Sequence, residues 1–207
     1  FTPVIFLAST PNLLVVNNNV PAKTTSELIA LAKKQPLTFG SSGSGTSIHL
    51  SGELFNTMAG VKMQHIPYKG RAAAIPDLLG GRITMIFDNM PSALPLVKSG
   101  ELRAIAVTSA QRSAAAPNIP TLAESGLPGF DATSWFALFA PAGLPRDIQL
   151  KINAETARVL AMPDVKEKLA TLGLDEAPGT PEQLGTFVQS EMVKWAKVVK
   201  ESGAKAD

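Results

Sequence analysis

The sequence contains no cysteine, two histidines and a single tyrosine. Without cysteine the chain forms no disulfide, binds no metal through a thiolate and uses no cysteine nucleophile. Two histidines leave little for a histidine-rich metal site. No apolar run reaches the roughly 18 residues that a transmembrane helix needs, so we expect no direct membrane insertion. The net charge of +2 is too small to argue for a nucleic-acid partner.

The composition is nevertheless that of a folded protein. The 207 residues, 45% hydrophobic and 17% charged, provide for one large domain or two small ones around a sizeable core. Residues 1–128 carry 10 Lys/Arg and 6 Asp/Glu, whereas residues 129–207 carry 9 and 11, so the first part weakly favours an anionic partner. The opening residues show no signal-type segment, and we expect the chain to be the inside of a longer protein, without its targeting segment.

Short apolar strands alternate with helices of about ten residues along the first half of the chain, which predicts βαβ units and a mainly parallel sheet. We therefore expect an α/β fold. A capping box, Thr24-x-x-Glu27, marks one helix start, and Gly60 follows the end of another helix. The expected strands are 4–7 and 13–16 (two strands or one bent strand), 37–39, 63–66, 83–87 and 102–107, and the expected helices begin near residues 24, 46, 71 and 92.

The pattern changes after Pro117. A connection rich in proline and glycine leads to an apolar strand at 135–139, and three helices follow, at about 147–160, about 164–172 and from 181 onward. The last of these begins with Thr180-Pro181-Glu182-Gln183, which combines a threonine cap with a proline at the first helical position and a glutamine three residues after the cap. Trp135 and Trp195 lie on apolar runs, and we expect both in the core.

A strand, a Gly/Ser turn and a helix follow one another between Phe39 and Leu50. The free N–H groups of the first helical turn and the positive end of the helix dipole form an anion site, to which hydroxyl side chains add donors. The alternative is a plain strand–helix connection whose Ser and Thr residues only cap the helix. The candidate binding residues are Ser41, Ser42, Gly43, Gly45, Thr46 and Ser47.

Three enzyme loops do not fit this turn. A Walker A loop requires lysine where Thr46 stands, a dinucleotide-binding loop requires glycine where Ile48 stands, and a nucleophile elbow requires glycine where Ser44 stands. A carboxylate or another small oxyanion is therefore the expected ligand.

Polar residues also follow the next two strands. Tyr68 and Lys69 come after the strand at 63–66, where a hydroxyl and an ammonium suit an acidic ligand, although a solvated surface turn could carry the same residues. Asp88 and Asn89 come after the strand at 83–87. Because ligands of open α/β sheets bind outside the carboxyl ends of strands, we expect these groups to converge on the Gly/Ser turn. Asp88 has no visible carboxylate partner, which favours positioning a ligand hydroxyl or water over acid–base catalysis.

The residues that remain favour binding over catalysis. His49 lies inside an expected helix and is interpreted as structural. The sequence shows no nucleophile–base pair, no metal-ligand spacing and no cofactor loop, so we expect neither a cofactor nor a metal and no enzyme activity. The alternative is an α/β enzyme domain that binds a phosphorylated or carboxylated metabolite at the Gly/Ser turn.

Several motifs stand in a fixed order along the chain. They are Pro11-x-x-Leu14-Val15-Val16, Phe39-Gly40-Ser41-Ser42-Gly43-x-Gly45-Thr46-Ser47-x-His49-Leu50, Pro67-Tyr68-Lys69-Gly70, Asp77-Leu78-Leu79-Gly80-Gly81, Met85-Ile86-Phe87-Asp88 and Ala140-Pro141-Ala142-Gly143. In this order they closely resemble the Bug (TctC-like) family, the periplasmic solute-binding proteins of tripartite tricarboxylate transporters. The resemblance covers essentially the whole chain.

The resemblance implies a fold like the type II periplasmic-binding proteins, with two lobes of mainly parallel sheet that close on a small carboxylate. Residues 17–130 would form the second lobe. Residues 1–16 and 131–207 would form the hinge strands and the C-terminal part of the first lobe, whose N-terminal part is absent from this chain. The Gly/Ser loop would hold one carboxylate of a mono-, di- or tricarboxylate, and Asp88 would orient the ligand's other polar end or its bridging waters.

The resemblance also implies a location and partners. It implies a periplasmic protein whose partners are a small carboxylate and the membrane permease subunits of the transporter, and a ligand-sensing role in signalling would use the same cleft. Residues 131–207 would lack part of the sheet against which they should pack. We therefore expect exposed apolar surface or an oligomer.

Overall fold

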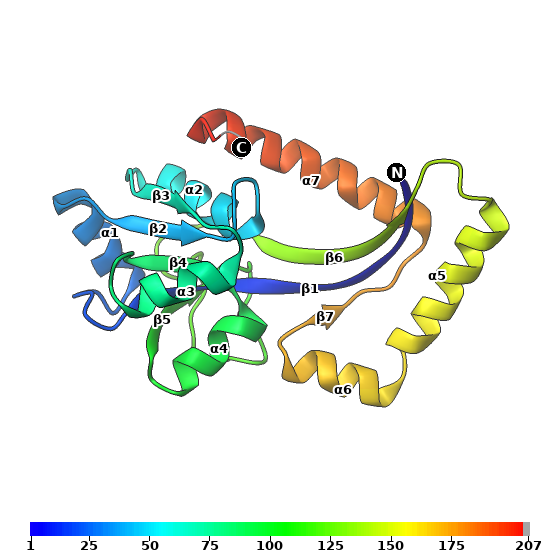
Figure 1. The fold of residues 1–207 in the computed structure, drawn as a ribbon, viewed down its shortest axis with the longest axis horizontal. Helices are drawn as coiled ribbons and strands as arrows, with labels where there is room; N and C mark the ends of the chain where they lie inside the picture. The colour runs from blue at the N-terminus through cyan, green and yellow to red at the C-terminus, as the bar shows by residue number, and fades with distance from the viewer. Residues whose placement is uncertain (205–207) are drawn as a thin grey trace.

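The computed structural model describes residues 1–204 (Figure 1), which form a mixed α/β fold, so the predicted α/β class is confirmed. All elements except β7 lie close to the predicted positions. In chain order they are β1 (Thr2–Asn17), α1 (Thr25–Lys34), β2 (Thr38–Ser41), α2 (Ser47–Ala59), β3 (Gln64–Pro67), α3 (Arg71–Leu79), β4 (Met85–Asn89), α4 (Met90–Lys98), β5 (Leu102–Val107), β6 (Thr133–Ala140), α5 (Arg146–Leu160), α6 (Pro163–Thr171), β7 (Asp175–Glu176) and α7 (Pro181–Ser202).

One long strand, β1, runs through both halves of the molecule (Figure 1). Residues 2–11 pair with β6, and residues 12–17 pair with β4 and β5. The two apolar runs that the sequence left open as two strands or one are therefore a single strand, with irregular register beside Pro3, Phe6 and Leu14. Such irregularities bend a strand and increase its twist, which lets β1 serve both halves.

The sheet is mixed rather than mainly parallel. Its order is β3-β2-β4-β1-β5, with β6 and β7 also paired to β1. β2 pairs in parallel with β3 and with β4, whereas all four pairings of β1 are antiparallel. β4 and β5 thus run in the same direction with β1 inserted between them. The alternation of strands and helices predicted the βαβ units but not the strand that enters from the other half.

β1 separates two hydrophobic clusters. Leu14 and Val16 belong to one cluster and Leu13 and Val15 to the other, and none of the four has exposed surface. This follows from the period of two in a strand, which sends successive side chains to opposite faces. Side chains of α1 and α2 complete the first cluster, and side chains of α3 and α4 complete the second. Each fully buried side chain of this size contributes about 1.5–3 kcal/mol.

The C-terminal elements gather along the first part of β1, and α7 continues from there to α2 (Figure 1). The predicted capping box at Thr180 and Gln183 is present at the start of α7. Seven large apolar side chains of β6 and α5 are 39–46% exposed, namely Phe136, Leu138, Phe139, Ile148, Leu150, Ile152 and Val159, so the expected exposed apolar surface is confirmed. Within residues 1–204 no helix has the length and apolar character to cross a membrane.

Gly52 generates a stability prediction. A Cβ at this position in α2 would overlap the ring of Phe39, which is fully buried. We expect Gly52→Ala to lower the free energy of unfolding by about 1–3 kcal/mol through overpacking, although alanine is the better helix former. As a control, Gly185→Ala in α7 would meet only Pro3 Cγ, at 3.8 Å, and should keep or raise stability by up to about 1 kcal/mol. Urea unfolding that gave both variants equal stability would contradict this close packing.

Candidate ligand-binding site

A cavity of about 450 Å³ opens at the N-terminus of α2. Its walls come from the β2–α2 loop, α2, the end of β4, the start of β6 and α7. The lining residues are Ser42, Gly45, Thr46, Ser47, Leu50, Asn89, Thr133, Ser134, Trp135, Phe136 and Trp195. Four of the six predicted Gly/Ser loop residues are among them, as is Asn89 at the carboxyl end of β4.

The Gly/Ser loop presents donors to this cavity. Gly43 and Gly45 have φ of +126° and +78°, values that favour glycine. Thr46 caps α2: its Oγ1 accepts the His49 N–H at 3.4 Å and donates to Gly43 O at 2.8 Å. Thr46 is therefore the N-cap of α2. Capping leaves backbone donors available to a ligand, because the first N–H groups of a helix have no partner inside it. These amides and the positive end of the helix dipole favour an anion.

Polar side chains from four elements form a hydrogen-bond network beside the cavity, and three of them, Ser47, Asn89 and Ser134, line it. Asn89 Nδ2 donates to Asn12 Oδ1 and to Ser134 Oγ, both at 2.6 Å. Ser134 Oγ lies 2.6 Å from Ser47 Oγ, and Asn12 Nδ2 donates to Ser51 Oγ at 3.0 Å. Sequence reasoning missed Asn12 and Ser134. The available signal was their position: each stands directly before an apolar run, Asn12 before 13–16 and Ser134 before 135–139.

The two tryptophans belong to the wall of this cavity. Trp135 and Trp195 are half-buried, and both indole N–H groups donate to Glu191 Oε2, at 3.2 and 2.8 Å. The prediction that Trp135 lies in the core is wrong, because the alternation of β6 buries its neighbour Ser134 instead. Trp195 both packs against the first hydrophobic cluster and lines the cavity.

Tyr68 and Lys69 follow the neighbouring strand end but do not line the cavity. The Tyr68 N–H donates to Ser41 O at 3.2 Å, so the strand ends do converge. The Tyr68 side chain turns to α3, where its O–H donates to Asp77 Oδ2 at 2.7 Å. Burial and this hydrogen bond raise the pKa of Tyr68 to about 12, and the same bond, with that from Arg82, lowers the pKa of Asp77. Lys69 is exposed.

Asp88 lies behind the cavity and has no exposed surface. Its Oδ2 accepts from Arg71 Nε at 2.6 Å, and its Oδ1 accepts the Asn89 N–H at 3.0 Å. Burial raises the pKa of Asp88, while Arg71 and the Asn89 amide act in the opposite direction. A buried carboxylate without a partner would be strongly destabilising, which the Arg71 pair avoids. In this geometry Asp88 orients Asn89 and does not itself face the cavity.

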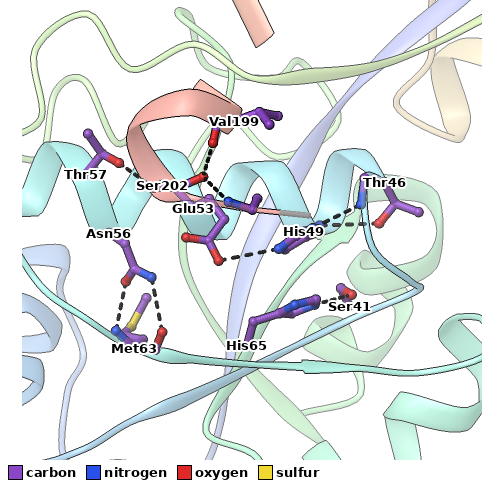
Figure 2. Close-up of polar contacts among 12 residues, drawn as sticks. Ser41, Thr46, His49, Glu53, Asn56, Thr57, Met63, His65, Val199 and Ser202 are labelled. Atoms are coloured by element: carbon purple, nitrogen blue, oxygen red, sulfur yellow. Dashed lines mark hydrogen bonds and ion pairs between the residues drawn. The ribbon is translucent and has the colours of Figure 1, made fainter. Parts of the chain in front are cut away.

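His49 and His65 lie behind the Gly/Ser loop, one on α2 and the other on β3 (Figure 2). His49 is 3% exposed, which agrees with the interpretation of a residue buried in a helix. Neither imidazole is among the groups that line the cavity.

The lining residues define the chemistry that the cavity can perform. No lysine or arginine is among them, so an anion would be held by N–H, hydroxyl and amide groups. Leu50 and the two tryptophans offer apolar surface beside these donors. In the described part of the chain no group of three His, Cys, Asp or Glu residues could hold a metal ion. The arrangement therefore suits an organic acid with a carboxylate and an apolar body.

Comparison with known sequences identifies relatives along the whole described chain. Residues 1–204 match the family described as "Tripartite tricarboxylate transporter family receptor" (TctC). Protein BugT of Bordetella pertussis is 38% identical over 205 residues, which is 98% of this chain and 63% of BugT. A "UPF0065 protein in tcbD-tcbE intergenic region" of Pseudomonas sp. (strain P51) is 39% identical over 204 residues, 97% of this chain and 61% of that protein. The chain thus spans about three fifths of these relatives.

Three solved structures share the fold. "R. palustris Rpa4515 with adipate" has a TM-score of 0.94 at 39% identity and covers 100% of this chain and 70% of its own. The periplasmic binding protein BugD has a TM-score of 0.91 at 30% identity, with 100% and 71% covered. MatC from Rhodopseudomonas palustris, with bound malate, has a TM-score of 0.87 at 32% identity, with 96% and 69% covered. From the family match and these folds, the chain belongs to the TctC (Bug) family of tripartite tricarboxylate transporter receptors.

Proposed function

We propose that the chain is part of a periplasmic solute-binding protein that captures a small carboxylate and delivers it to a tripartite tricarboxylate transporter. The observation that carries the proposal is the cavity at the N-terminus of α2, which combines hydrogen-bond donors with an apolar wall. The solved relatives with adipate and with malate support a carboxylate as the ligand. Membrane permease subunits would be the partners, and no catalytic step is required of the chain.

We assign the following roles at the site. The hydroxyls of Ser42 and Ser47, with the first N–H groups of α2, bind one carboxylate, and the Asn89 amide contacts the ligand from β4. Thr46 lines the same site and holds the loop through its hydrogen bond to Gly43 O. Gly43 and Gly45 allow the backbone to approach the ligand. The remaining candidates, Ser41, Tyr68 and Asp88, hold the loop and the strand ends from behind, and the exposed Lys69 attracts anions from the rim of the site.

We also propose that ligand binding favours closure of two lobes of the protein. Residues 17–130 form one lobe, and residues 1–16 with 131–207 form the hinge strands and part of the other. The passage of β1 through both halves of the molecule supports this division (Figure 1). A carboxylate that contacts both lobes binds the closed form more tightly than the open form and so shifts the population towards closure.

Intrinsic fluorescence tests the proposal. Both tryptophans of the sequence line the cavity, so a bound carboxylate should change their emission. We would titrate the full-length protein with adipate, malate, citrate, inorganic phosphate and glucose, and we expect a saturable change with carboxylates only. Trp195→Phe should reduce the change without abolishing binding measured by calorimetry. A response to phosphate but to no carboxylate would contradict the proposal and favour the enzyme alternative.

The loop hydroxyls yield a second prediction. Ser42→Ala and Thr46→Ala should each weaken carboxylate binding by about 0.5–3 kcal/mol. Ser42→Ala removes a hydroxyl donor to the ligand, and Thr46→Ala removes the hydrogen bonds with Gly43 O and the His49 N–H that fix the loop and the first turn of α2. Thr46→Ala should also lower the free energy of unfolding by about 0.5–2 kcal/mol, since Thr46 caps α2.

Thr180→Ala provides a matched control for this prediction. It removes the cap of α7, away from the cavity, and should lower stability by a similar amount while leaving the affinity for carboxylates unchanged. Calorimetric titration and thermal unfolding of the same three variants measure both quantities. If Ser42→Ala and Thr46→Ala both bind carboxylates as tightly as the parent, the loop is not the binding element.

A further inference from the structure

The Gly/Ser loop is held from behind by two stacked histidines (Figure 2). The rings of His49 and His65 have centroids 3.8 Å apart and are inclined by 13°. Phe39 of β2 stacks on the His65 ring at 5.1 Å and lies 6.3 Å from the His49 ring. This packing fixes the planes of both imidazoles, so their ring nitrogens point in fixed directions.

The contacts of His49 define its protonation state. The Gly45 N–H donates to Nδ1 at 3.0 Å, so Nδ1 carries a lone pair and no proton. Nε2 lies 3.4 Å from Glu53 Oε1, as expected of a ring N–H that faces a carboxylate. The ring is therefore the neutral tautomer with its proton on Nε2, assigned from the hydrogen bonds that the two nitrogens make.

His65 holds the other end of the loop through Ser41. His65 Nε2 and Ser41 Oγ are 2.6 Å apart, and Ser41 Oγ accepts the Gly43 N–H at 3.1 Å. The two loop glycines with positive φ, Gly43 and Gly45, are thus both tied by their amides to the histidine stack, one directly and one through a serine. Glycines lose the most conformational entropy on ordering, so these two bonds act where the loop is least constrained.

We propose that His49 and His65 are positioning residues for the bound carboxylate, and that the loop keeps its binding geometry only while Nδ1 of His49 is unprotonated. The proposal rests on the carboxylate-binding function proposed above. Because neither imidazole lines the cavity, both act through the loop backbone and make no contact with the ligand.

Protonation of His49 Nδ1 would break its hydrogen bond with the Gly45 N–H. The ring would then present a donor to the Gly45 N–H, and the amide would lose its partner. In residues 1–204 the titratable groups that face the His49 ring are Glu53 on its own helix and His65 from β3, while β2 contributes Phe39, which does not titrate. Two imidazolium rings stacked this closely would repel each other.

The test is a pH profile of affinity in the full-length protein, with adipate as the probe. Between pH 8 and pH 5.5 a histidine changes charge. The second carboxyl of adipate begins to protonate at the lower end of this range, so each affinity is referred to the concentration of the adipate dianion. We expect the affinity for adipate to fall about tenfold over this range, the equivalent of one lost hydrogen bond. An affinity that is constant or that rises on acidification would overturn the proposal.

Two substitutions distinguish the effect of the Nδ1 acceptor of His49 from the effect of its aromatic ring. His49→Asn places an amide oxygen near the position of Nδ1 and cannot titrate, so it should bind adipate at pH 8 within about threefold of the parent and lose the pH dependence. His49→Phe keeps an aromatic ring in the stack but has no acceptor, and it should bind about tenfold more weakly at every pH. Parental affinity in His49→Phe, or an unchanged pH profile in His49→Asn, would overturn the proposal.

A measurement without ligand keeps this inference separate from the proposed function. Amide hydrogen exchange of Gly45, corrected for the intrinsic effect of pH, should show protection at pH 8 that is lost at pH 5.5 in the parent and retained in His49→Asn. Absence of binding to adipate, malate and citrate at pH 8 would count against the proposed function, whereas equal protection of Gly45 at both pH values in the parent would overturn the role of the histidines. His65→Gln, which retains a group that can bond Ser41, should keep the exchange pattern of the parent at pH 8.

Discussion

The hydrogen bonds at the midpoint of β1 constrain the structure around it. Between Pro11 and Leu13 the strand changes partners, from β6 on one side of this point to β4 and β5 on the other. Asn12, at this point, is fully buried, and its N–H and C=O pair with Thr108 at 2.8 and 2.9 Å. A buried backbone N–H or C=O group without a partner costs about 1–3 kcal/mol. Thr108 therefore satisfies the backbone groups of Asn12 at the point where β1 changes partners.

The same network includes residues that line the cavity. The Asn12 side chain forms hydrogen bonds with Asn89 of β4, Ser134 of β6 and Ser51 of α2. The residue at which β1 changes partners therefore also fixes the positions of the Asn89 and Ser134 side chains. The N-terminus of α2 adds a partial positive charge of about half a unit. An anion held by such dipoles needs no buried counter-ion, which agrees with the function proposed above, in which the ligand is released as well as bound.

Local signals predicted most of the fold. The capping boxes at Thr24 and Thr180 and the glycine after α2 are set by residues within one turn, and each lies where the sequence predicts. Strand direction and cavity walls depend on distant pairings, which explains why the antiparallel insertion of β1 and the place of Trp135 were not predicted. The chemistry of the Gly/Ser loop predicted an anion site, whereas Asn12 joins the polar network beside the cavity only because β1 crosses the molecule there.

The order of the anion loop depends on an acceptor whose charge can change. A loop with glycines at positive φ is costly to fix, and its amides need acceptors on the side away from the ligand. A carboxylate in that position would repel a bound anion, and a lysine offers no acceptor. A neutral imidazole supplies the acceptor without charge, and its ring also stacks on the partner histidine. Because that acceptor is lost on protonation, the choice of histidine makes the geometry of the loop sensitive to proton concentration.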